Sequence, residues 1–165
     1  MTVGLMAVEG WMGKHATLPV RATLGSTMLY HGLSKVKGEG VAQTAGFFES
    51  LGIKPGRLWA LATGWTEVAA GALSILGIGT RAAAVSILVT QAMAIAKVHA
   101  KNGFNIQKGG YEYNLGLIAS ALGLLLSGPG SLSIHQLLSR QRRRQGLLGL
   151  VSRRSQPVLL ASLLA

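Results

Sequence analysis

The chain of 165 residues contains no cysteine and no aspartate, and charged residues make up only 13% of it. Without cysteine the chain forms no disulfide, no thiolate nucleophile and no cysteine metal site, so redox chemistry would need a bound carrier or a partner protein. Soluble domains typically carry about 25% charged residues. The shortage of charge, together with a hydrophobic share of 49%, predicts an integral membrane protein.

Acidic residues are few, because only five glutamates stand against 16 lysines and arginines. No acid follows Glu112, whereas six arginines do: Arg140, Arg142, Arg143, Arg144, Arg153 and Arg154. The run from Arg140 to Arg144 lacks the aromatic platform that nucleic-acid binding would use. We therefore expect no nucleic-acid partner, and we expect this run to attract anionic lipids beside the bilayer.

Four apolar stretches have about the length that a membrane-spanning helix needs. They cover residues 18–35, 58–78, 80–99 and 111–127. Between the first two, apolar residues recur at helical spacing over about ten residues, which predicts an interfacial helix too short to span. The fold class is therefore predicted as all-α, a membrane four-helix bundle over residues 18–130, between an N-terminal segment (1–17) and a basic tail (131–165).

Basic residues near the ends of the spans predict the orientation. Four spans place both termini on one side, and that side carries Lys14, Arg21, Arg81 and the arginines of the tail. We therefore expect both termini in the cytoplasm. The 23 glycines allow close helix packing and leave room for a homo-oligomer, and the small residues Ala60, Gly64 and Gly71 predict a packed face on the second span.

Glu67 lies near the middle of the second span, where a carboxylate is costly unless it is paired or protonated. One interpretation is a proton-handling group that contacts a quinol. The alternative is a structural ion partner inside the bundle, with Arg21 or Arg81 as the candidate cation.

Polar side chains gather where the first and third spans end and the fourth begins, on one side of the membrane. Histidine beside a carboxylate is suited to accept protons from a quinol. We assign proton handling to His99 and Glu112 together with Glu67, and a quinone pocket to His31, Lys35, Tyr113 and Asn114. The alternative is that these residues cap helices and anchor them at the interface. These residues do not identify a cofactor: a quinone is one candidate, haem between His31 and His99 is not favoured, and no metal site is assigned.

Several short motifs, in their order and spacing, resemble the DoxX family over roughly residues 18–133. They are Arg21–Gly25 and His31–Lys35, Phe47–Phe48 and Leu51–Pro55, Glu67–Gly71 and Leu76–Arg81, His99 with Asn102–Phe104, Gly110–Leu115, and Gly128–Ser131. The resemblance implies a four-helix protein of the bacterial cytoplasmic membrane. It also implies an association with redox chemistry, since members include a subunit of a thiosulfate:quinone oxidoreductase and proteins linked to oxidative stress.

Three functions follow as hypotheses. The first is a quinone-linked membrane subunit of an oxidoreductase complex, with a soluble partner that supplies electrons. The second is a non-catalytic scaffold that anchors soluble oxidoreductases at the membrane. The third, small-molecule transport, is less favoured because the chain shows no broken helix or inverted repeat of the transporter type.

Overall fold

The computed structural model describes residues 15–139 and residue 141, and within these ranges the chain is helical and has no strand. The long helices are α2 (Thr17–Val36), α4 (Gly56–Leu76), α5 (Thr80–Ala94) and α6 (Glu112–Ser127), with a shorter α3 (Gly40–Ser50) between the first two. A π turn (Ile95–His99) extends α5, and two 3-10 turns (Ala100–Asn102 and Ile106–Lys108) lead to α6. The prediction of an all-α chain is confirmed.

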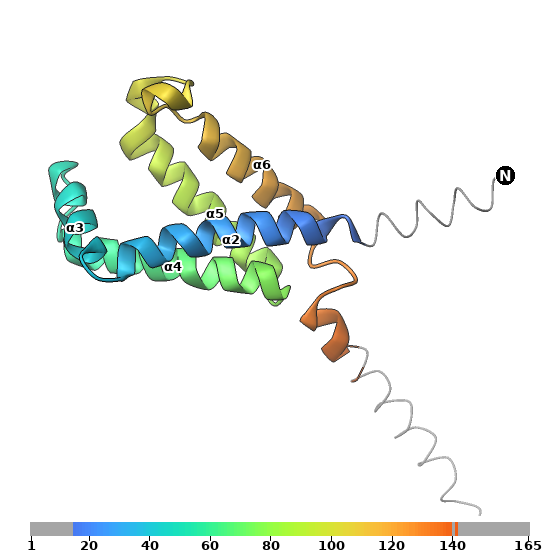
Figure 1. The fold of residues 1–165 in the computed structure, drawn as a ribbon. Helices are drawn as coiled ribbons and strands as arrows, with labels where there is room; N and C mark the ends of the chain where they lie inside the picture. The colour runs from blue at the N-terminus through green and yellow to red at the C-terminus, as the bar shows by residue number, and fades with distance from the viewer. Residues whose placement is uncertain (1–14, 140, 142–165) are drawn as a thin grey trace, which may run out of the picture.

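The helices form two pairs that cross (Figure 1). Helices α2 and α4 lie side by side and antiparallel, and α5 and α6 form the second pair. The two pairs diverge towards the end of the molecule where α3 lies. Each predicted span coincides with a long helix to within a few residues, and the short helix predicted between the first two spans is α3.

Glycines set the close packing of α2 against α4. A Cβ atom added at Gly71 would lie 2.6 Å from the carbonyl oxygen of Gly25 and 2.7 Å from the amide nitrogen of Leu29. Two helical turns after Gly25 on α2, a Cβ at Gly32 would lie 2.7 Å from the carbonyl oxygen of Gly64. The backbones therefore touch where each helix carries a glycine, which confirms the packed face expected from the small residues of the second span.

Replacement of Gly71 by alanine is expected to destabilise the protein by about 1–3 kcal/mol, because the added methyl group meets backbone that cannot move alone. The matched control is Gly123→Ala on α6, where nothing lies within 4 Å of an added Cβ. That control should be neutral or slightly stabilising, since alanine favours a helix over glycine. Thermal unfolding in detergent, followed by circular dichroism, measures both; equal melting temperatures for the two variants would contradict the packing described.

The buried core is small and lies where the two pairs cross. Its centre consists of Leu24 and Met28 of α2, Ala84 and Ile87 of α5, and Ala121 and Leu124 of α6. Small alanines on α5 and α6 let these two helices pack closely on each other, and α6 also contacts α2. The core therefore holds the two pairs together without filling the space where they diverge.

Arg21 closes the opposite end of the bundle. Its side chain is only 2% exposed and donates to four backbone carbonyls. Nε bonds to Ser74 at 2.9 Å and Nη2 to Ile75 at 2.7 Å, while Nη1 bonds to Pro129 at 2.8 Å and Leu132 at 2.7 Å. The guanidinium thus satisfies carbonyls at the C-terminal end of α4 and joins them to the turn after α6.

The turn between α4 and α5 depends on two glycines in the left-handed region. Gly77 has φ +68° and Gly79 has φ +56°. The amide of Ile78 bonds to the Leu73 carbonyl at 3.1 Å, which closes the end of α4 in the manner of a Schellman motif. This connection forces α4 and α5 into a tight hairpin, as expected from the absence of a loop in the sequence.

Among the described residues, one helical segment is both long and apolar enough to cross a membrane, namely Thr80–Asn102, which joins α5 to the turns that follow it. Helix α6 is apolar but has 16 residues, and α2 and α4 are long but less apolar, since they carry Arg21, Lys35 and Glu67. The four predicted helices are therefore confirmed, whereas a membrane crossing by each of them stays a prediction.

Large apolar side chains are exposed outside the cavities on two helices, as Leu58 and Trp65 of α4 and Leu122 and Leu126 of α6 are. Leu126 is 79% exposed. Extended apolar surface of this kind suits contact with lipid or with other helices. The first 14 residues and most of the predicted basic tail, Arg140 and Arg142–Arg144 included, lie outside the described residues.

Candidate functional site

A cavity of about 810 Å³ lies where the two helix pairs diverge, and we call it the central cavity. Residues from α2, α3, α4, α5 and α6 line it. Its apolar wall consists of Phe47, Phe48, Leu51, Ile53, Trp59, Ala62, Val85, Val89, Met93, Ala94, Val98 and Leu117. Its ionisable residues are His31, Lys35, Glu67, Lys97, His99 and Tyr113. The other lining residues are polar and uncharged: Thr63, Thr66, Ser86, Thr90, Gln91 and Asn114. The surface of the cavity is nevertheless mainly apolar, as in ligand pockets generally.

Glu67 and Lys35 form an ion pair in this cavity. Lys35 Nζ lies 2.6 Å from Glu67 Oε2. The Glu67 side chain is 7% exposed and the Lys35 side chain 23% exposed, so the carboxylate is the more deeply buried partner. The same ammonium group lies 3.3 Å from the carbonyl oxygen of His31, one helical turn before it. The pair neutralises a carboxylate that would otherwise be costly at this depth.

His31 lies at the level of this pair, on the turn of α2 that precedes Lys35. Its ring is in edge contact with Tyr113 of α6 at a centroid distance of 6.3 Å, and with the neighbouring Tyr30 at 5.6 Å. Both His31 and Tyr113 line the cavity. The contact therefore brings the end of the first long helix to the beginning of the last one.

His99 ends the π turn that follows α5. Its Nδ1 lies 2.7 Å from the carbonyl oxygen of Gly109, which the Nδ2 amide of Asn102 also approaches, at 3.1 Å. A π turn inserts an extra residue into a helix and is frequent at functional sites. Here the turn contains Lys97, Val98 and His99, which all line the cavity.

A buried pair of amides supports the floor of the cavity. Asn114 Nδ2 donates to Gln91 Oε1 at 2.9 Å, and Gln91 Nε2 lies 3.8 Å from the sulfur of Met28. Asn114 was predicted as a site residue because it lies among the polar residues at the start of a span, whereas the uncharged Gln91, inside a span, was not predicted. An amide inside an apolar span was the signal that could have found it.

Three residues from the sequence analysis lie away from the cavity. Glu112 does not line it; its Oε2 accepts from the amide of Ile106 at 3.2 Å and so holds the loop before α6. Arg21 contacts carbonyls rather than Glu67, and Arg81 is exposed at the start of α5, with no ion pair among the described residues. The partner of Glu67 is therefore Lys35, not an arginine, since the packing of α2 on α4 brings Lys35 within reach.

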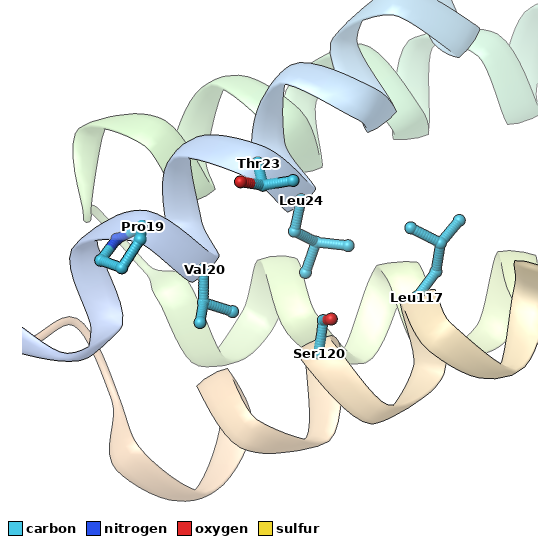
Figure 2. Close-up of a pocket in the computed structure, with 6 residues that line it drawn as sticks. All are labelled: Pro19, Val20, Thr23, Leu24, Leu117 and Ser120. Carbon is cyan, nitrogen blue, oxygen red and sulfur yellow. The ribbon is translucent and has the colours of Figure 1, made fainter.

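A second, smaller cavity of about 270 Å³ lies between α2 and α6 (Figure 2). Val20 and Leu24 point from α2 towards α6, and Leu117 points back (Figure 2). Pro19, Thr23 and Ser120 complete its lining. It contains no ionisable group, so it offers no chemistry beyond apolar contact. Within the described ranges, no three histidine or glutamate side chains come close enough to hold a metal ion.

A comparison with protein families identifies a relationship that covers most of this site. The model of the DoxX family matches residues 16–100, about half of the chain. The chain belongs to the DoxX family. The matched part of this DoxX protein contains His31, Lys35, Glu67 and His99, whereas Tyr113 and Asn114 follow it. DoxX proteins are associated with membranes, which agrees with the apolar helices described above.

One relative is similar in sequence, but its description names no function. This DoxX protein is 32% identical over 82 residues to an uncharacterized protein of Haemophilus influenzae. The match covers 50% of this chain and 54% of that protein, so the chain spans about half the length of its relative. No solved structure matches the chain.

Proposed function

We propose that this DoxX protein is a membrane subunit that binds a quinone in the central cavity and takes part in electron transfer with a soluble oxidoreductase. The observation that carries the proposal is the composition of that cavity. Its walls are apolar, and its ionisable groups come from the ends of α2 and of the α5 extension, the start of α6 and the middle of α4. A quinone likewise has an apolar part, its chain, and a polar part, a ring that carries two carbonyl oxygens.

Aromatic side chains support a flat ring as the ligand. The chain has nine aromatic residues, as three each of tryptophan, tyrosine and phenylalanine. Four of them line the cavity: Phe47, Phe48, Trp59 and Tyr113. Aromatic rings gain from offset or edge contacts with another ring. In the proposal the quinone ring lies among these side chains, near the α3 end of the bundle.

The ionisable groups of the cavity suit the two carbonyl oxygens of a quinone. Lys35 is a donor that can turn from Glu67 towards a ring oxygen, and the imidazole of His31 is a second donor within the same cavity. Reduction of a quinone to a quinol consumes two electrons and two protons. Glu67, His31 and His99 are groups that could move those protons.

The electrons in this proposal come from a partner, because the chain has no cysteine and therefore no dithiol of its own. In the proposal the partner is a soluble oxidoreductase that docks at the α3 end of the bundle, beside the central cavity. The charge pattern predicts both termini at the opposite, cytoplasmic face. The basic tail would hold anionic lipids near that face. The protein itself would supply the quinone site and the membrane anchor.

His31→Ala is expected to weaken quinone binding about tenfold, which corresponds to about 1.4 kcal/mol, the loss of one hydrogen bond at a buried site. The measurement is equilibrium binding of a short-chain quinone to the purified protein in detergent. The matched control is His135→Ala, since His135 is exposed on a short helical segment after α6 (residues 134–139) and does not line the cavity. That control should bind like the wild type.

A well-folded wild-type protein that shows no saturable quinone binding would contradict the proposal. The second hypothesis, a scaffold that anchors soluble oxidoreductases, would then be favoured. If His31→Ala and His135→Ala weaken quinone binding equally, the quinone binds elsewhere in the molecule.

A further inference from the structure

The ionisable lining of the central cavity is unbalanced in charge. Glu67 is the only carboxylate among the described lining residues, and Lys35 already neutralises it at 2.6 Å. Lys97 also lines the cavity, as an exposed residue at its rim, and it forms no ion pair within the described part of the chain. His31 and His99 also line the cavity, and an imidazole supplies no negative charge that could act as a counterion. A ligand in this cavity therefore meets one cation that has no counterion.

The unpaired cation lies at one end of an apolar stripe on α5 and its π extension. Val85, Val89 and Met93 line the cavity at intervals of four residues, and Lys97 follows at the same interval. Twelve residues of helix rise about 18 Å. The cavity thus offers a long apolar wall that ends at an ammonium group.

Neighbouring side chains cover this wall only in part. Val85, Val89 and Met93 are all close to half exposed although they line the cavity. On the facing helix, Trp59 and Thr66 of α4 are exposed lining residues as well. A chain-like molecule could therefore enter between α4 and α5 from the surrounding lipid.

We infer that the central cavity binds single-chain amphiphiles with an anionic headgroup, with the chain along the α5 stripe and the headgroup at Lys97. The inference goes beyond the proposed function, because a quinone is neutral, but it uses the same cavity. The charge of the lining carries the choice of occupant, since an ammonium group bonds more strongly to an anion than to a neutral oxygen. Lys35 lies nearby as a second cation, held by Glu67.

The test compares a fluorescent fatty acid with its methyl ester, which has the same chain and no charge. The purified full-length protein is placed in nanodiscs of zwitterionic lipid, and equilibrium binding of each probe is measured. The acid is expected to bind about tenfold more tightly than the ester. Lys97→Gln should remove this preference and leave binding of the ester unchanged.

Lys101→Gln is the matched control, because Lys101 is exposed four residues further along the chain and does not line the cavity. It should keep the tenfold preference. Equal affinity of the wild type for acid and ester would overturn the inference, and so would a preference that Lys97→Gln leaves intact.

Short-chain quinone binding, measured on the same samples, separates this inference from the proposed function. Quinone binding is read on the wild type and on His31→Ala, so it does not depend on how Lys97→Gln behaves. A protein that binds the acid through Lys97 but binds no quinone would refute the proposed function alone. A protein that binds quinone but does not distinguish acid from ester would refute this inference alone.

Discussion

Arg21→Met is expected to lower the free energy of unfolding by about 3–5 kcal/mol, the largest effect of any single substitution considered. Arg21 is buried and donates four hydrogen bonds, to the carbonyls of Ser74, Ile75, Pro129 and Leu132. Methionine can fill part of the volume but donates none of these bonds. The carbonyls at the end of α4 and after α6 would then be left without a partner.

The melting temperature of the purified protein, followed by circular dichroism in detergent, measures this effect. Arg81→Met is the matched control, since Arg81 is exposed and forms no ion pair among the described residues. The control should change stability by about 0.5 kcal/mol or less. Arg21→Lys should fall between the wild type and Arg21→Met, because an ammonium group has three donors in place of the guanidinium's five. Similar melting temperatures for Arg21→Met and Arg81→Met would refute the closing role of Arg21.

Lys35→Met is expected to cost about 3 kcal/mol, because it leaves the Glu67 carboxylate buried without a partner. Glu67→Gln should cost less, about 1 kcal/mol, since Lys35 is 23% exposed and can turn towards a polar neighbour or the interface. The difference in burial between the two partners therefore predicts unequal effects of the two single changes.

The double variant Lys35→Met/Glu67→Met supplies the control, since it removes both charges. Replacement of a buried ion pair by apolar residues of similar size is often neutral or stabilising. The double variant should therefore be more stable than Lys35→Met alone. Additive losses in the double variant, measured by the same thermal unfolding, would show that the two residues do not act as a pair.

The helices of this protein could be predicted from the sequence with good accuracy. Apolar runs, the glycine-rich turn around Gly77 and the break at Gly128 set the ends of α2, α4, α5 and α6. The helical spacing of Val41, Ala45 and Phe48 predicted α3. These signals are local, since each depends on residues within a few turns of one another.

The contacts between helices were harder to predict. Glu67 was expected to have Arg21 or Arg81 as its ionic partner, yet it pairs with Lys35, 32 positions away in the chain. That pairing depends on the register of α2 against α4, which Gly25, Gly32, Gly64 and Gly71 set by close approach. A sequence shows that these glycines exist, but not which of them face one another.

The candidate site shows the same division between local and long-range information. One end of the bundle was predicted to hold His31, Lys35, His99, Tyr113 and Asn114, and the structure brings these residues to one cavity with Glu67. Glu112, next to Tyr113 in the chain, instead holds the loop before α6. Adjacent residues at the start of a helix point in different directions. Two residues that are neighbours in the chain therefore need not belong to the same site.

Fluorescence quenching by a short-chain quinone tests the central claim most directly. Trp59 lines the cavity, whereas Trp65, on the same helix and similarly exposed, does not. We expect saturable quenching of the wild type that Trp59→Phe loses and Trp65→Phe retains. Quenching that never saturates, or that Trp65→Phe abolishes while Trp59→Phe keeps it, would contradict a quinone site in the central cavity.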